Sequence, residues 1–170
     1  MSRGFVKESD QEELPFIPPR APLPAGEVNY VTPAGLRALE AEAAGLEAEK
    51  DALSTDNEDE RRRFITILDA KLAPLRQRLN SARVINPEGQ PADEVRFGAT
   101  VTLTFLATGR AKTLQLVGVD EADVKKGKIA FTSPIAQAIT GLWANEVANF
   151  GPGKEVRRIR VDTITYLIDA

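Results

Sequence analysis

Two stretches of this 170-residue chain repeat apolar residues at alternating spacings of three and four. The first runs through Leu36, Leu39, Ala43, Leu46, Lys50 and Leu53, with the lysine as its one break, and the second through Ile65, Leu68, Leu72, Leu75, Leu79 and Ala82. Such spacing places an apolar stripe along one side of a helix and is typical of coiled coils. Because only a short polar stretch separates them, we predict an antiparallel coiled-coil hairpin over residues 31–86.

The ends of the two helices carry capping residues. Thr32 followed by Pro33 suits the N-cap and first position of the first helix. Residues 55–58 (TDNE) read as a capping box for the second helix, which places the tip of the hairpin near residues 54–57. Pro74 falls inside the second helix, where it removes one backbone hydrogen bond and is expected to cause a kink one turn before it.

The C-terminal half has the patterns of strands. Residues 101–105 alternate apolar and polar side chains, residues 108–110 suit a hairpin turn, and residues 113–117 form the returning strand. Residues 128–132 and 156–168 are further strand candidates. Ser133 and Pro134 open a short helix that runs to Gly141. We predict an α+β fold whose second domain, residues 94–170, is a mostly antiparallel sheet with one short helix.

The remaining segments are rich in proline and glycine. Five of the eleven prolines lie between Pro15 and Pro24, so residues 1–30 fit neither a helix nor a central strand. We predict an extended, partly disordered arm, mobile unless Phe16 and Ile17 find a groove on the folded chain. The arm is either a poorly ordered tail or a docking peptide with a preformed polyproline II conformation. Residues 87–93 form the linker between hairpin and domain.

Composition excludes several kinds of chemistry. The chain has no cysteine and no histidine, which removes thiol nucleophiles, disulfides, zinc sites built on these residues and catalytic triads. The net charge of −3 gives no sign of a strongly basic nucleic-acid surface. No window is long and apolar enough to span a bilayer, and the N-terminus has no apolar core of a signal peptide. We therefore expect a cytoplasmic protein with no membrane partner.

Charge is concentrated at the predicted tip. Residues 47–60 contain seven acidic side chains and one lysine, whereas residues 94–170 contain ten basic and eight acidic side chains. Acids at a helix N-terminus are stabilised by capping and by the helix dipole, which is a sufficient reason for their presence. The alternative is a rod that delivers carboxylates to a place that the globular domain cannot reach.

Several motifs resemble one known family in order and spacing. Residues 97–101 (FGATV), 117–123 (VGVDEAD) and 133–141 (SPIAQAITG) resemble the C-terminal signature of the bacterial Gre transcription factors, GreA and GreB. Residues 30–36 (YVTPAGL) and 79–85 (LNSARVI) are similar to the start and the end of that family's coiled coil. The proline-rich arm has no counterpart in the typical member.

The resemblance implies an FKBP-like fold for the C-terminal domain and docking of that domain on bacterial RNA polymerase, at the rim of the secondary channel. The docking candidates carried over from the family motif are Asp120, Glu121, Asp123, Ser133, Pro134 and Ile135. Their alternative role is structural, since Ser133 and Pro134 suit a helix cap and the acids suit a solvated loop. The resemblance further implies that nucleic acid is met only indirectly, through the elongation complex, and that the polymerase, rather than this chain, is the enzyme.

Family members pass the hairpin into the channel, where tip acids help the polymerase to hold a second catalytic Mg²⁺. We expect no tightly bound cofactor, and only Mg²⁺ shared with the polymerase. The family's tip pattern D-x-x-E fails here, because a count from Asp51 puts Ser54 in the place of the glutamate. The hairpin is also shorter by roughly 15 residues, which at 1.5 Å per residue makes the rod about 10 Å shorter.

The substitute acids at the new tip are Asp56, Glu58, Asp59 and Glu60, with Asp56 and Asp59 as the candidate metal ligands on one helical face. Two functions follow. The favoured one is a regulator that binds in the secondary channel without completing the metal site, and the alternative is a true transcript-cleavage factor. A prolyl isomerase is a remote third hypothesis, suggested by fold alone.

Overall fold

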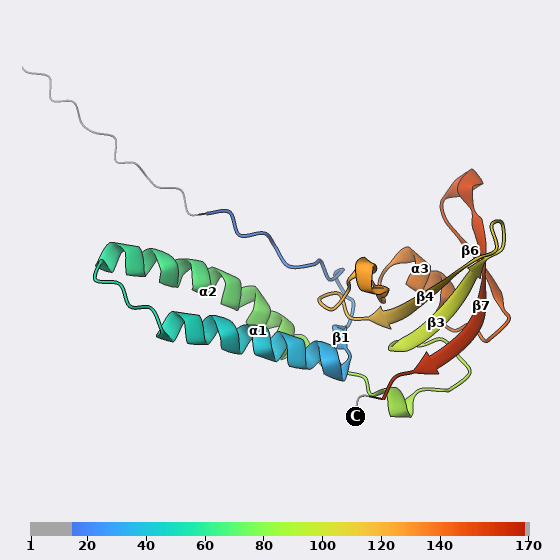
Figure 1. Ribbon diagram of the computed structural model, residues 1–170, viewed down its shortest axis with the longest axis horizontal. Helices are drawn as coiled ribbons and strands as arrows, with labels where there is room; N and C mark the ends of the chain where they lie inside the picture. Colours follow the sequence, from blue (N-terminus) through green and yellow to red (C-terminus); the bar gives the residue numbers. More distant parts are fainter. Residues whose placement is uncertain (1–14, 169–170) are drawn as a thin grey trace, which may run out of the picture.

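The computed structural model describes residues 15–168. It consists of a rod of two helices and a curled β-sheet with one short helix, which lie beside each other along the long axis of the molecule (Figure 1). The predicted α+β class is confirmed. None of the helices in the described part is long and apolar enough to cross a membrane.

The rod is formed by α1 (Pro33–Asp51) and α2 (Glu58–Ser81), which run antiparallel. The predicted apolar stripes face each other. Their buried members are Leu39 and Ala43 on α1 and Leu68, Leu72 and Leu75 on α2. Thr32 is the N-cap of α1 as predicted, since its hydroxyl accepts a hydrogen bond of 2.9 Å from the N–H of Gly35.

Two residues that conflict with an ideal coiled coil are accommodated. Lys50, which interrupts the first stripe, is half-buried and donates a 2.7 Å hydrogen bond to Asp69 on the opposite helix. A lysine can hold its apolar stem within a packed interface while its ammonium group reaches the edge. Pro74 lies inside α2, which nevertheless continues to Ser81.

A small sheet that the sequence did not predict closes the base of the rod. β1 (Tyr30–Val31) pairs in parallel with β2 (Arg83–Val84). The buried side chain of Asn29 donates hydrogen bonds from Nδ2 to the carbonyl of Arg78 (2.9 Å) and to the hydroxyl of Ser81 (3.1 Å). The two ends of the hairpin are therefore joined where they meet the globular domain.

The globular domain is built on a five-stranded sheet with the order β5-β4-β3-β7-β6. Its strands are β3 (Ala99–Phe105), β4 (Arg110–Val117), β5 (Lys128–Ala130), β6 (Val147–Phe150) and β7 (Arg157–Tyr166). Pairing is antiparallel except between β4 and β5. β6 was not predicted from the sequence, because its four residues are too few to show a clear alternation of apolar and polar side chains.

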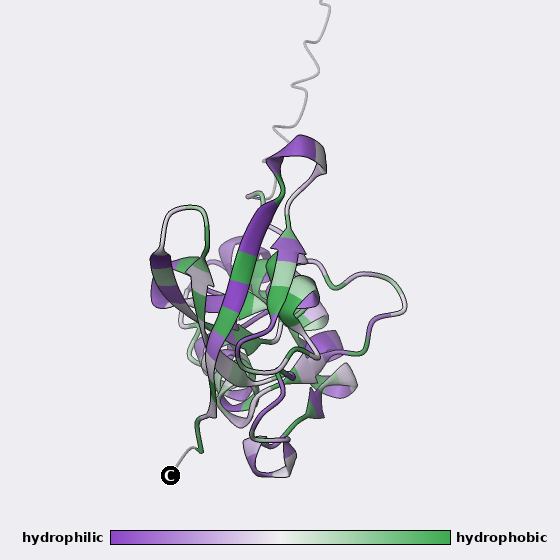
Figure 2. Ribbon diagram, turned by 90° about the vertical axis from the view of Figure 1, so that its right-hand side faces the viewer, coloured by the Kyte–Doolittle hydropathy of each residue, from purple (hydrophilic) through white to green (hydrophobic). Residues whose placement is uncertain are grey.

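One face of the sheet forms the core of the domain. Alternate residues of β3, β4 and β7, such as Leu103, Leu114 and Val161, are buried there. α3 (Pro134–Ile139) covers this face and contributes Ala136 and Ile139. The alternation of hydrophilic and hydrophobic residues is visible along β7, the long strand that faces the viewer in Figure 2.

Three single-turn 3₁₀ helices complete the structure: Pro87–Gly89 in the predicted linker, Val124–Lys126 and Gly153–Glu155. The described part of the predicted arm, residues 15–30, contains no helix, as its prolines require, and its last residue, Tyr30, belongs to β1. Residues 1–14 of the arm lie outside the described residues.

Candidate functional site

The loop between α1 and α2 carries the acidic tip. The N-cap of α2 is Asn57, whose Oδ1 accepts hydrogen bonds from the N–H groups of Asp59 (3.0 Å) and Glu60 (3.2 Å). The capping box predicted at residues 55–58 was therefore wrong by two positions. The Thr55 hydroxyl instead accepts from the N–H of Asn57 (3.3 Å) and donates to the carboxylate of Glu60 (3.1 Å). Asn and Thr both suit an N-cap, so the sequence left the choice open.

The four candidate carboxylates Asp56, Glu58, Asp59 and Glu60 are exposed at the end of the rod. Asp56 lies before the N-cap, so it does not share a helical face with Asp59, and that expectation was wrong. Within residues 15–168, no three acidic side chains lie close enough together to hold a metal ion. A role for Asp56 and Asp59 toward Mg²⁺ remains a prediction.

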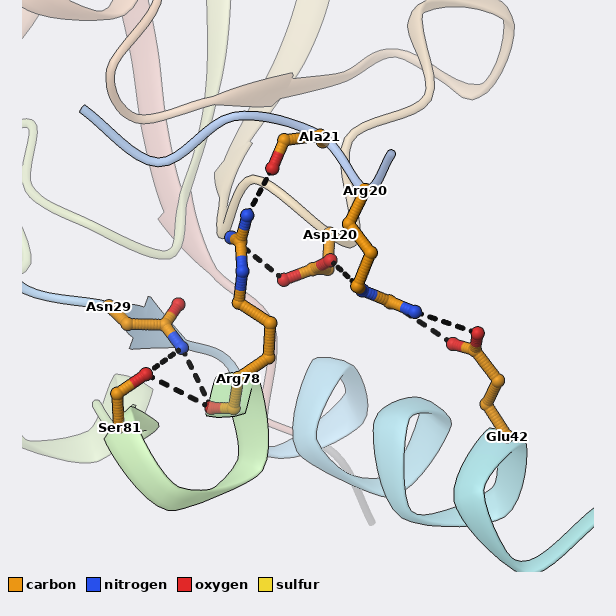
Figure 3. Close-up of polar contacts among 7 residues, drawn as sticks. All are labelled: Arg20, Ala21, Asn29, Glu42, Arg78, Ser81 and Asp120. Atoms are coloured by element: carbon orange, nitrogen blue, oxygen red, sulfur yellow. Dashed lines mark hydrogen bonds and ion pairs between the residues drawn. The ribbon is translucent and has the colours of Figure 1, made fainter. Parts of the chain in front are cut away.

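Asp120, one of the predicted docking residues, lies at a buried joint between three segments (Figure 3). Its side chain is only 7% exposed. Oδ1 accepts a hydrogen bond of 2.9 Å from Nε of Arg20 in the arm, and Oδ2 accepts one of 3.3 Å from Nη1 of Arg78 in α2. One carboxylate thus links the arm, the rod and the globular domain.

The two arginines extend this joint. Both terminal nitrogens of Arg20 donate to the carboxylate of Glu42 on α1, at 2.8 and 3.1 Å, and Arg78 donates to the carbonyl of Ala21. The hydrogen bonds to Glu42 raise the pKa of Arg20, burial opposes this, and the hydrogen bond and charge of Asp120 add to the rise. We name the set Arg20, Glu42, Arg78 and Asp120 the arginine joint.

Glu121 and Asp123 also have partners inside the chain. Glu121 accepts from the Thr32 hydroxyl (2.5 Å) and from Nζ of Lys128 (3.1 Å), so it ties the start of α1 to the sheet. Asp123 caps the Val124–Lys126 turn by accepting from the N–H of Lys125 (3.1 Å). The family resemblance made these acids docking candidates, with a solvated loop as the alternative, and the structure gives each of them a contact within the chain.

Close backbone approach holds the rod against the domain. A Cβ on Gly118 would lie 2.6 Å from the carbonyl oxygen of Tyr30, which leaves no room for a larger residue. The ring of Tyr30 packs against Phe97 and Phe131, with centroids 5.8 and 5.6 Å away. Such tilted and edge-on aromatic contacts are favourable in packed interfaces.

The second group of predicted docking residues opens α3. Ser133 is the N-cap and accepts a 3.4 Å hydrogen bond from the N–H of Ala136, and Pro134 is the first helical residue and is exposed. Ile135 packs partly buried against the core. The structural role of Ser133 and Ile135 is therefore established, and Pro134 is the exposed member of the three.

Arg20, Glu42 and Arg78 are the residues of the joint that sequence reasoning missed. Glu42 and Arg78 lie on helices whose many charged residues suit a solvated surface, and the partners are 22 to 100 residues apart in sequence. An arginine between two prolines and an alanine was the only local hint, since it is the single charged residue between Pro15 and Pro24.

Comparison with known proteins identifies the family. Residues 90–166 match the model described as "Transcription elongation factor, GreA/GreB, C-term". The chain is 40% identical over 114 residues to the transcription elongation factor GreA of Ralstonia nicotianae, which covers 66% of this chain and 70% of that protein. It is 38% identical over 109 residues to GreA of Neisseria meningitidis serogroup A, covering 64% and 67%.

Solved structures of GreA-type factors are also similar. A GreA/GreB factor from Nitrosomonas europaea has 23% identity and a TM-score of 0.41, covering 82% of this chain and 99% of that one. The GreA factor homolog Gfh1 of Thermus thermophilus has 22% identity and a TM-score of 0.38, covering 81% and 99%. The sequence identity to curated members over two thirds or more of their length decides the assignment: this chain belongs to the GreA/GreB family of transcription elongation factors.

Proposed function

We propose that this protein binds bacterial RNA polymerase at the secondary channel and regulates transcription there, without itself performing covalent chemistry. Membership of the GreA/GreB family supports the partner. The observation that supports the regulatory role concerns the rod. The rod is short, and its end presents solvated carboxylates. In this proposal the polymerase is the enzyme and the rod changes what the channel admits.

The dimensions of the rod support a binding role. α1 has 19 residues, which at 1.5 Å per residue correspond to about 28 Å.

The carboxylates of Asp56, Glu58 and Asp59 form no side-chain hydrogen bond or ion pair with another residue in the described part of the chain. Free carboxylates at the end of a narrow rod repel phosphates and attract cations over about 8 Å at physiological salt.

Transcript cleavage is the second candidate. It needs two or more oxygen ligands that share Mg²⁺ with the polymerase, because Mg²⁺ binds few protein carboxylates and keeps several waters. Asp59 and Asp56 lie on either side of Asn57, the N-cap of α2, and both are exposed. Their freedom from internal partners is what keeps this candidate open.

The docking face in this proposal is the loop that contains Asp120, Glu121 and Asp123, together with the start of α3. Because Asp120 and Glu121 are engaged inside the chain, they act by setting how the rod projects from the domain. In this proposal Pro134, which is exposed, contacts the polymerase.

A cleavage assay on a backtracked complex of the cognate polymerase tests the proposal, with a full-length Gre factor as positive control. We expect saturable binding to core polymerase and no Mg²⁺-dependent shortening of the transcript. Shortening that is lost in Asp59→Asn, with binding intact, establishes the cleavage function instead. Asp69→Asn is the matched control, since Asp69 lies on the same helix away from the tip. Absence of binding rejects both functions.

A further inference from the structure

The end of the sheet opposite the rod holds a cationic groove that the family assignment does not explain. It is a hollow of about 520 Å³ whose charged lining residues are Arg110, Lys112, Arg157 and Arg158. No acidic side chain lines it. Figure 1 shows that this end, where β3 turns into β4 and where β7 begins, points away from α1 and α2.

The groove continues the core face of the sheet. In the register of the strands, Phe105 stands opposite Arg110 on β4 and Ile159 on β7, and Leu103 stands opposite Lys112. Residues that are opposite each other point to the same face. The face that buries Leu103 therefore carries Lys112 and Arg110 once it has passed beyond the cover of α3, which has only six residues.

The groove combines apolar and charged lining residues. Phe105 is partly buried against the core and lines the hollow, together with Ala107 of the turn and Ala111 of β4. We call these three apolar side chains the floor of the groove, and the four cations line the same hollow. A concave site of this size with an apolar floor and a few charged groups has the character of a binding pocket.

The four cations have no paired counter-charge among the residues that the structure describes. None of them forms a side-chain hydrogen bond or ion pair with another residue between 15 and 168. Arg160, on the same strand as Arg157 and Arg158, does have an acidic partner, because it donates a 2.7 Å hydrogen bond to Asp162. Clustered like charges destabilise a sheet, so a cluster without internal partners points to an external anionic one.

We propose that this groove binds an acidic peptide segment of a protein partner, one that places an apolar side chain on Phe105 and carboxylates against the arginines. Two features favour a peptide over nucleic acid. The cations converge on one hollow instead of following a stripe, and the chain as a whole carries a net charge of −3 and a pI near 5.2, which disfavours a long polyanion. The site is separate from the rod and does not depend on the secondary-channel proposal.

The test uses the full chain and a fluorescein-labelled ten-residue peptide of alternating Asp and Glu with one Phe and one Leu at its centre. Fluorescence anisotropy is measured at physiological salt. The double variant Arg110→Ser/Arg157→Ser should weaken binding about tenfold or more, because the peptide loses a charge-assisted hydrogen bond with each guanidinium that is removed. Arg61→Ser/Arg62→Ser is the matched control, because it removes the same charge from exposed arginines near the tip of the rod and should leave binding unchanged.

Two further probes sharpen the test. A labelled oligoglutamate of the same charge should bind more weakly than the peptide, because it has no side chain for the apolar floor. A single-stranded oligodeoxynucleotide of the same charge should bind more weakly as well. The proposal is overturned if the peptide does not bind, if both double variants weaken it equally, if oligoglutamate binds as well as the peptide, or if the oligonucleotide binds more tightly. Thermal melting of both variants checks that each is folded.

Discussion

At the scale of single residues, Asp120 has the most demanding position in the molecule. Its carboxylate is 7% exposed and faces Arg20 and Arg78, whose side chains are 18% and 14% exposed. A charge in such a place is stabilised by its partners. Removal of the Asp120 carboxylate takes from Arg78 the acidic partner that it has in the described chain, and Arg20 keeps its hydrogen bonds to Glu42. Family resemblance pointed to Asp120 as a contact for a partner, whereas its neighbours make it an internal link.

We predict that Asp120→Asn lowers the free energy of unfolding by about 2–4 kcal/mol, because two half-buried guanidinium groups lose their shared counter-charge. Urea denaturation followed by circular dichroism measures this. Asp69→Asn makes the same chemical change in a pair with Lys50 whose carboxylate is 49% exposed, and it should cost under about 1 kcal/mol. Equal losses in the two variants would contradict the assignment of Asp120 to a buried joint.

Two glycines give a second prediction of opposite signs. Gly118→Ala should destabilise the fold by about 1–3 kcal/mol, because the new Cβ would press on the carbonyl oxygen of Tyr30 and push β1 from the domain. Gly45→Ala should stabilise it by about 1 kcal/mol, since Gly45 lies within α1 with nothing within 4 Å of the added Cβ. The melting temperatures of the two variants test both predictions. A Gly118→Ala protein as stable as the unchanged one would show that the contact between residue 118 and the carbonyl oxygen of Tyr30 is not tight.

At the scale of elements, the rod depends on its caps as well as on its apolar seam. α2 begins with three acidic residues, Glu58, Asp59 and Glu60, beside the positive end of the helix dipole. Asn57 satisfies two of the otherwise unpaired N–H groups of that first turn. The seam sets how the helices pack, and the cap sets where the second helix begins.

Asn57→Ala should therefore lower the stability of the chain by about 1 kcal/mol and fray the first turn of α2. Hydrogen exchange at the N–H groups of Asp59 and Glu60 would rise in the same variant. Asp56→Ala is the neighbouring control, because Asp56 is exposed and caps nothing. If Thr55→Ala has the larger effect, the capping box predicted from the sequence is the true arrangement.

At the scale of the whole molecule, the described part of the proline-rich arm is a strap across the rod and the domain. Ile17 and Pro18 line a hollow with Leu46 and Pro74 of the rod, and Arg20 reaches both Glu42 and Asp120. Phe16 is 85% exposed and finds no such place. Of the two side chains considered as anchors of the arm, Ile17 is half-buried and Phe16 is exposed.

This arrangement predicts the order of cleavage by trypsin. The bond after Arg20 should be cut more slowly than the bond after exposed Lys154, because trypsin needs the free side chain of the residue that it recognises and Arg20 is held by two carboxylates. In Asp120→Asn, the rate at Arg20 should rise about tenfold as the strap opens more often. Mass spectrometry of timed digests measures both sites, and early cleavage at Arg20 in the unchanged protein would mean that the strap is loose.

The local features of this fold could be predicted from the sequence. The hairpin, the Thr32 cap, the β3–β4 hairpin and the Ser133 cap all follow from residues within one or two turns of each other, because periodicity and capping depend on neighbours in the chain. Where two cap residues competed, at Thr55 and Asn57, the same local rules were ambiguous. β6 and the parallel β1–β2 pair are too short to show a pattern.

The sequence by itself determined the rod, the alternating strands, the acidic tip and the family motifs. Only the tertiary structure decided what the charged residues of the arm, α2 and the docking loop contact, and that four cations of β4 and β7 surround one hollow. The physical reason is that a helix or a strand is stabilised by residues close in sequence, whereas a buried charge is stabilised by whichever partner the fold brings near. Asp120 meets Arg20 across 100 residues, a distance over which no local spacing carries information.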